Sequence, residues 1–251
     1  MILWELDWVE PRFLLCEIAR WFILSRNGEN AINEAKQVVY YLLMSAPITH
    51  IVFTEKIFDK YFSGLDKKKF IIGTSFPDIR YLANLDRSVT HYESTQLKNI
   101  LNEDSFLAGF HFHSVVDRVM KENNDRYDIF SFFPENTKNA SEAIKTIFDV
   151  TLRPKISDWN KIENIFGEIL EEELLFGTSK VVVERWHAIL QNYIKTMPDY
   201  RDSLPGYIVT DAAMVTANIT KALDDLTDEK REGLVGLAEE IYENIERSLE
   251  G

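Results

Sequence analysis

The segment GFHFHSVVD, residues 109–117, places His113 and Asp117 four residues apart in an apolar stretch of the chain. Residues at this spacing project from one face of an α-helix, so the imidazole and the carboxylate can bind the same ion. Both groups are ligands of zinc, and of iron or manganese when further oxygen ligands join them. A hydrogen bond between the two side chains on the helix surface is the alternative interpretation of the pair.

Three residues of the same chemical types lie upstream of this pair: His50, Asp78 and His91. Asp78 follows Pro77 in a segment of glycine, threonine, serine and proline, which we expect to be a loop that holds the carboxylate on irregular backbone. Taken singly, the three residues are also typical of helix starts and N-caps. Four of the five histidines nevertheless precede residue 114, and this uneven distribution favours a shared metal site.

Two further residues near these candidates have more than one interpretation. His111 lies two residues before His113, so on a helix it points about 200° away from it. His111 can be a core histidine, a hydrogen-bond partner of a ligand, or the ligand in place of His113. Arg80 follows Asp78 by two residues and is a candidate for contact with a phosphoryl oxygen, because a guanidinium group matches that geometry. A solvated side chain is the alternative for Arg80.

Helices are expected to position these residues. Apolar residues recur at intervals of three and four along most of the chain, and strand patterns are almost absent. Ser157, Asp158 and Thr227 are N-cap candidates, and residues 73–77 form a predicted break between helices. We therefore expect an all-α, multi-helix bundle. The expected helices cover residues 31–44, 49–62, 94–102, 105–120, 140–148, 158–176, 179–195, 208–223 and 228–249.

The chain is expected to form one all-α domain over residues 44–251, preceded by a helical extension over residues 1–43. Met44 directly precedes the segment that carries the first candidate ligand, so a start of translation at Met44 is the alternative explanation of the extension. Glu17 and Arg20 interrupt the apolar residues near the N-terminus, which also lack the pattern of a secretory signal. We expect neither export nor a membrane span.

Composition excludes several classes of partner. The formal net charge of -13 opposes the phosphate backbone of nucleic acid and anionic membrane surfaces, so bulk binding of nucleic acid is not expected. The single cysteine, Cys16, excludes an intramolecular disulfide framework and gives no basis for a thiolate zinc site. A cytoplasmic location is the simplest expectation.

The order of the candidate fragments resembles the zinc-dependent phospholipase C family, which is related in fold to the S1/P1-type nucleases. The matching fragments span about residues 44–120 and are Thr49-His50, Gly73 with Pro77-Asp78, Thr90-His91, and Gly109 with His113 and Asp117. The resemblance implies an all-α bundle of the phospholipase C and P1 nuclease type, with metals at one end of a cleft. It also implies that one metal site is formed by Asp78, His91, His113 and Asp117. His50 would bind a second metal, with Asp117 bridging the two.

The chain also departs from the family's pattern. Secreted members use an N-terminal tryptophan as a ligand and carry an H-x3-E pair for another zinc, and no such pair follows Asp117 here. The nearest later candidates are Glu184 and His187, which share a helix face. Their segment ERWHAIL is, however, typical of an ordinary amphipathic helix. We therefore expect a centre of one or two metals rather than three.

These patterns indicate a metal-dependent hydrolase with Asp78 and Asp117 as catalytic carboxylates and a small phosphoester or phospholipid-like substrate. Zn²⁺ is the expected metal, with Mn²⁺ or Fe²⁺ as alternatives. Two other functions stay open. HD-type phosphohydrolases also use histidine and aspartate on an all-α scaffold, although this chain has no His-Asp dipeptide. A non-catalytic helical protein that retains a partial metal site is the other alternative.

Overall fold

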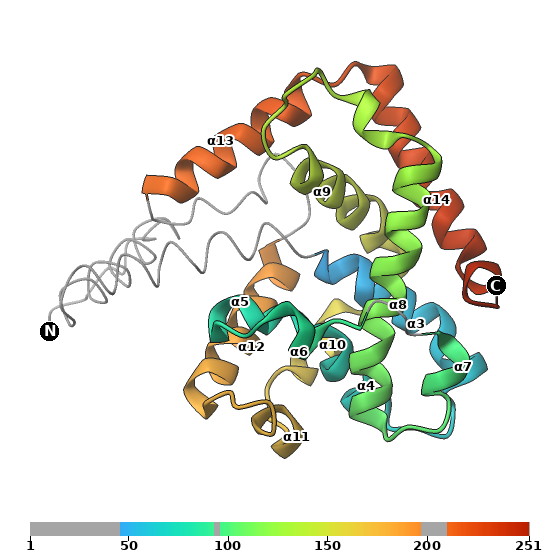
Figure 1. The fold of residues 1–251 in the computed structure, drawn as a ribbon, viewed down its shortest axis with the longest axis vertical. Helices are drawn as coiled ribbons and strands as arrows, with labels where there is room; N and C mark the ends of the chain where they lie inside the picture. The colour runs from blue at the N-terminus through green and yellow to red at the C-terminus, as the bar shows by residue number, and fades with distance from the viewer. Residues whose placement is uncertain (1–45, 93–95, 197–209, 251) are drawn as a thin grey trace, which may run out of the picture.

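The structure is a computed structural model that describes residues 46–92, 96–196 and 210–250 (Figure 1). These residues form α-helices and short 3-10 helices with no strand among them, so the all-α prediction is confirmed. The predicted extension over residues 1–43, the alternative start at Met44, and Cys16 lie outside the described residues. The elements are α3 (Pro47–Tyr61), α4 (Lys67–Ser75), η1 (Pro77–Ile79), α5 (Arg80–Ala83), α6 (Arg87–Thr90), α7 (Leu97–Ile100), α8 (Ser105–Arg126), η2 (Ile129–Phe132), α9 (Ala140–Leu152), η3 (Arg153–Lys155), α10 (Trp159–Ile165), α11 (Glu171–Leu174), α12 (Lys180–Thr196), α13 (Thr210–Asp224) and α14 (Asp228–Glu250).

The long helices α3, α8, α9, α12, α13 and α14 begin within two residues of their predicted starts. Two predicted caps are present. The Asp158 side chain accepts a hydrogen bond from the backbone N–H of Lys161, and the Thr227 hydroxyl accepts one from the backbone N–H of Lys230. Such caps satisfy N–H groups that the first turn of a helix leaves unpaired, which is why they mark helix starts in the sequence.

Two regions differ from the prediction. The helix predicted over residues 158–176 is wrong, because α10 ends at Ile165 and α11 covers only Glu171–Leu174. The backbone N–H groups of Phe166 and Gly167 bond to carbonyls three residues back, and this tight closure ends α10. The break predicted over residues 73–77 is confirmed in part, because α4, a helix that was not predicted, ends within it at Ser75 and η1 begins at Pro77. Asp78 therefore lies on a 3-10 turn and not in a loop.

Gly73 and Gly109 explain why α4 continues as a helix through a glycine. A Cβ atom added at Gly73 would lie 2.1 Å from the carbonyl oxygen of Phe106, and one added at Gly109 would lie 2.0 Å from the carbonyl oxygen of Phe70. The backbones of α4 and α8 therefore touch with no side chain between them. Glycine has no Cβ and permits this close approach, which places the C-terminal turn of α4 next to the middle of α8.

The helices form two groups joined by α8, which runs between them (Figure 1). One group contains α9, α13 and α14, and the other contains α4, α10, α11 and α12. Buried phenylalanines fill the space between α3, α4 and α8, where the Phe70 ring lies 5.3 Å from the Phe58 ring and 5.7 Å from the Phe112 ring. Ion pairs of Lys56 with Glu243 and of Lys60 with Glu246 join α3 to α14.

None of the helices in the described part of the chain combines the length and the apolar character that crossing a bilayer requires. The longest of them, α8 and α14, contain many charged residues. This agrees with the expectation that these segments do not span a membrane.

The Gly109→Ala variant tests the backbone contact between α4 and α8. The added Cβ would overlap a backbone carbonyl, which cannot rotate away, so we expect the free energy of unfolding to fall by about 3 kcal/mol or more. Chemical denaturation followed by circular dichroism measures this. The matched control is Gly236→Ala in α14, where a Cβ would meet nothing within 4 Å and should stabilise the helix by about 0.5–1 kcal/mol. Equal effects at the two sites would contradict the close approach.

Candidate metal centre

The five predicted ligands lie together where α3, η1, α6 and α8 meet. Nε2 of His113 is 3.2 Å from Nε2 of His91 and 3.7 Å from Oδ2 of Asp117. The two oxygens of Asp78 lie 3.9 Å from Nε2 of His91 and 4.0 Å from Nε2 of His113. His50 approaches from α3, with its Nε2 3.4 Å from Oδ1 of Asp117. The structure therefore brings the five residues into two adjoining groups that share His113: Asp78 with His91, and His50 with Asp117.

Each ligand is positioned by a different local feature. His113 and Asp117 lie one turn apart on α8, as their spacing predicts. His91 directly follows α6, with its Nδ1 2.8 Å from the Thr90 hydroxyl. Asp78 lies on η1, immediately after α4. His50 lies in the first turn of α3, and its ring stacks on that of His113 with centroids 4.2 Å apart. Histidine and carboxylate side chains from four segments thus share one buried space.

Two backbone carbonyls fix which nitrogen of His50 and of His113 carries the proton. Nδ1 of His113 is 2.9 Å from the carbonyl oxygen of Thr74, and Nδ1 of His50 is 2.9 Å from the carbonyl oxygen of Ala46. A carbonyl only accepts hydrogen bonds, so each Nδ1–H must be the donor. In the neutral state, Nε2 of both rings then presents a lone pair to the centre. This is the arrangement that metal-binding histidines use to fix their tautomer and orientation.

Burying these imidazole and carboxylate groups together costs free energy unless a positive charge lies among them. Nε2 of His50 is buried and forms no hydrogen bond within the described part of the chain. The lone pairs of His50 and His113 face the carboxylates of Asp78 and Asp117, and groups that are all acceptors repel one another. Cations bound among these residues would satisfy lone pairs that otherwise face one another.

Electrostatics keep two of the histidines neutral. Burial, followed by repulsion from the neighbouring imidazole, lowers the pKa of His91 to about 3. The same causes, with His50 as the neighbour, lower the pKa of His113 to about 3. Both rings are therefore available as neutral ligands over the whole physiological pH range.

His50 and the two aspartates differ from this pair. Burial lowers the pKa of His50, but the carboxylates of Asp117 and Asp78 outweigh that effect and raise it overall. A proton and a metal ion therefore compete for Nε2 of His50. Burial raises the pKa of Asp78. Burial also disfavours the charged form of Asp117, but attraction to His113 and His50 leaves the pKa of Asp117 below its ordinary value.

The separations match a small coordination sphere. Four ligands at about 2.0–2.1 Å from a tetrahedral zinc ion lie about 3.4 Å from one another, close to the distances of 3.2–4.0 Å between ligand atoms around His113. Ligand atoms of Asp78, His91 and His113 lie within 4.8 Å of one another, as do those of His50, His113 and Asp117. One imidazole nitrogen binds one ion, so His113 serves a single metal. Asp117 can serve two, because one oxygen faces His50 and the other faces His91 and His113.

A buried carboxylate that sequence reasoning missed holds the start of α3. Asp149 of α9 is fully buried and accepts hydrogen bonds from the backbone N–H and the hydroxyl of Thr49, at 2.7 and 2.6 Å. The Tyr193 hydroxyl of α12 donates to its other oxygen at 2.8 Å. Thr49 directly precedes His50, so Asp149 fixes the backbone that carries this candidate ligand. Burial raises the pKa of Asp149 to about 6, against the effect of these three hydrogen bonds.

His111 is not part of the candidate metal centre. Its Nδ1 lies 2.7 Å from a carboxylate oxygen of Glu103, and it belongs to neither of the two possible metal groups in the described part of the chain. His111 therefore forms a separate hydrogen-bonded pair on another face of α8. The spacing of two residues from His113 was the signal for this difference.

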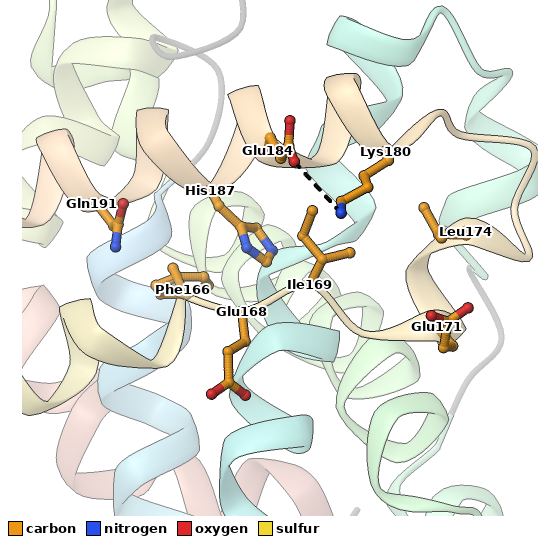
Figure 2. Close-up of a pocket in the computed structure, with 10 residues that line it drawn as sticks. Phe166, Glu168, Ile169, Glu171, Leu174, Lys180, Glu184, His187 and Gln191 are labelled. Carbon is orange, nitrogen blue, oxygen red and sulfur yellow. Dashed lines mark ion pairs between the residues drawn. The ribbon is translucent and has the colours of Figure 1, made fainter.

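Glu184 and His187 do not form a metal pair with each other. Nε2 of His187 lies 2.8 Å from a buried carboxylate oxygen of Glu173, whereas Glu184 pairs with Lys180 at 4.0 Å. His187, Glu184 and Lys180 line a separate cavity of about 540 Å³. Figure 2 shows His187 between the Lys180–Glu184 pair and Gln191 along α12. The interpretation of ERWHAIL as an amphipathic helix agrees with the observed α12.

The arginine that touches the centre is Arg87. Its guanidinium lies 3.5 Å from Oδ2 of Asp117. Arg80, the predicted phosphate contact, begins α5 and does not line the cavity beside Asp117. Hydrogen bonds from Ser88 lower the pKa of Asp86, and the charge of Arg80 adds to this effect. Sequence analysis did not identify Arg87, because its spacing from the candidate ligands follows no known motif. The fold places it beside Asp117 of α8.

Comparisons of this chain with protein-family models, with curated proteins and with solved structures find no match. The geometry and the chemistry of the described residues therefore carry the functional argument.

The Asp149→Asn variant tests the energetic role of the buried carboxylate. Because its folded-state pKa is about 6 and its unfolded value is 3.8, the folded protein binds the additional proton. Wild-type stability should therefore fall as pH rises through the window from about 4 to 6. The asparagine does not titrate, so its stability relative to wild type should increase by about 2 kcal/mol between pH 4.5 and pH 7.5.

Urea denaturation of both proteins across this pH range measures the difference. Tyr193→Phe is the control, because it removes one hydrogen bond and keeps the carboxylate. A difference between Asp149→Asn and wild type that stays constant with pH would contradict a raised pKa at this position.

Proposed function

We propose that this protein is a metal-dependent hydrolase of phosphoesters, with a fold and centre of the type found in the zinc-dependent phospholipase C family. The observation that supports it is the convergence of Asp78, His91 and Asp117 on His113, with ligand atoms 3.2–4.0 Å from its Nε2. The order of these residues along the chain, and the all-α fold that carries them, agree with that resemblance.

One principal metal ion is the best-supported occupancy. Asp78, His91 and His113 provide three ligand atoms. Oδ2 of Asp117, 3.7 Å from Nε2 of His113, would be the fourth, which is the number that zinc takes in a tetrahedral site. His50 and the other oxygen of Asp117 provide two ligands for a second ion. Imidazole and carboxylate suit Zn²⁺, and they also accept Mn²⁺ or Fe²⁺.

We assign different roles in hydrolysis to the two carboxylates, Asp117 and Asp78. A divalent cation at this centre supplies Lewis-acid stabilisation of a phosphoryl oxygen and makes water acidic enough to attack near neutral pH. Asp117 lines a cavity beside the centre, so its carboxylate is within reach of substrate, and an oxygen that holds no metal can orient the attacking water by accepting a hydrogen bond from it. Asp78 lies deeper and faces His91 and His113. Its role is to hold charge and fix these rings.

Phosphoester hydrolysis suits this centre better than the two alternatives. An HD-type phosphohydrolase would use adjacent histidine and aspartate, whereas the ligands here come from separate segments. A purely structural metal would be enclosed by protein, but Asp117 is about one-third exposed and adjoins a cavity. The cytoplasm remains our proposed location, on the basis of the single cysteine.

Metal binding is tested by a pair of variants on α8. We expect the wild-type protein to retain at least one equivalent of Zn²⁺ after metal-supplemented purification and desalting. His113→Asn should lower its zinc affinity at least about tenfold, since it removes a central ligand. His111→Asn is the matched control, because His111 lies on the same helix and pairs with Glu103 instead. Less than one equivalent in wild type, or equal zinc loss in both variants, would contradict the proposal.

Activity is tested with chromogenic phosphate monoesters and diesters. The metal-replete protein should hydrolyse at least one class, and a chelator should abolish turnover until Zn²⁺ or Mn²⁺ is restored. Asp117→Asn should lower kcat by on the order of 100-fold, because it removes the negative charge of a candidate ligand that also orients the attacking water. A metal-replete protein that hydrolyses no ester of either class would favour the non-catalytic alternative.

A further inference from the structure

A cavity of about 270 Å³ adjoins the candidate metal centre. His91 and Asp117 line it and also belong to the centre, so a molecule in the cavity can reach the metal ligands directly. The other lining residues come from α6, from the segment after it, and from α8; they are Arg87, Tyr92, Ser114, Arg118 and Lys121. The cavity is thus an extension of the site and not a separate hollow.

Positive charge is concentrated in this cavity. Arg87, Arg118 and Lys121 contribute three cations, and Asp117 is the one carboxylate among its lining residues. Each of the three has a carboxylate partner, and those of Arg118 and Lys121, which are Glu122 and Asp125, lie outside the cavity lining. A cleft lined by cationic side chains attracts anions and raises their local concentration.

The described contacts of Arg118 leave guanidinium donors for an additional acceptor. Nη1 of Arg118 donates to Glu122 at 3.2 Å, whereas its Nε is buried and forms no hydrogen bond within the described residues. Lys121 pairs with Asp125 at 3.0 Å in an exposed intrahelical contact, which is a weak and easily rearranged interaction. The Ser114 hydroxyl accepts from the backbone N–H of Tyr92 and keeps its own proton for donation.

The size of the cavity limits what it can bind. Its volume lies near the lower end of the range of about 300–1,000 Å³ typical of small-molecule sites. Phosphate and carboxylate groups fit a space of this size, and guanidinium recognises both through paired hydrogen bonds. A quaternary ammonium headgroup would instead be repelled by Arg118 and Lys121.

We propose that this cavity, with Arg118 and Lys121, binds a second anionic group of the substrate. The protein then acts on small phosphoesters that carry another phosphate or carboxylate a few atoms from the scissile bond. This inference rests on the proposed phosphoesterase function and narrows its substrate class. It excludes zwitterionic phospholipid headgroups as preferred substrates.

The test compares two substrates that differ in one group. 3-Phosphoglycerate has a carboxylate where glycerol 3-phosphate has a hydroxymethyl group. Metal-replete wild type should show a kcat/KM at least about tenfold higher for 3-phosphoglycerate, and phosphocholine should be the poorest substrate. In Arg118→Gln and Lys121→Gln this preference should fall about tenfold, mainly through KM for 3-phosphoglycerate, with little change for glycerol 3-phosphate.

Lys180→Gln is the matched control for Lys121→Gln. Both lysines are exposed and pair with a carboxylate four residues later, but Lys180 lines the separate cavity on α12. The control should keep the wild-type preference. A preference that is equal in all variants, or a preference for phosphocholine, would overturn the inference.

Pyrophosphate binding separates this inference from the proposed function. Calorimetry on chelator-treated protein should show pyrophosphate binding that weakens about tenfold in Arg118→Gln and not in Lys180→Gln. If that result holds while no ester is hydrolysed, the anion site stands and the phosphoesterase proposal fails. If esters are hydrolysed but pyrophosphate binding is independent of Arg118, the proposed function stands and this inference fails.

Discussion

The hydrogen bond from Nδ1–H of His113 to the carbonyl of Thr74 is the interaction on which the candidate centre depends. It turns the Nε2 lone pair of His113 toward Asp78, His91 and Asp117. The bond exists because α4 and α8 approach with no side chain between their backbones, as glycine permits at two positions. The buried imidazole and carboxylate groups around His113 have little contact with water, so a bound cation would stabilise them. Helix packing and ligand chemistry are therefore parts of one constraint.

Local periodicity made the helices and part of the centre predictable. The apolar repeat indicated the long helices within two residues of their starts, and the spacing of four placed His113 and Asp117 on one face. The same rule separated His111 from His113, and the structure pairs His111 with Glu103. His50, Asp78 and His91 were identified by residue type and by order along the chain. Their convergence is a property of the fold, which no local spacing describes.

Features that depend on tertiary contacts were not predictable. Glycine near proline usually ends a helix, so the break was predicted to begin at Gly73; α4 continues to Ser75, because the contact of Gly73 with α8 overrides that tendency. Asp149 lies 100 residues from Thr49 in sequence, and no pattern links the two. Arg87 and Arg118 were passed over because charged residues on helices are usually solvated. Only their shared cavity beside Asp117 distinguishes them.

The claim that Asp78, His91, His113 and Asp117 bind one metal ion is tested most directly by X-ray diffraction. Crystals of the protein grown with Zn²⁺ would be measured on both sides of the zinc absorption edge. The geometry predicts an anomalous peak about 2.0–2.1 Å from Nε2 of His91 and Nε2 of His113, with oxygens of Asp78 and Asp117 completing the site. Absence of anomalous density among these four side chains in zinc-replete crystals would contradict it.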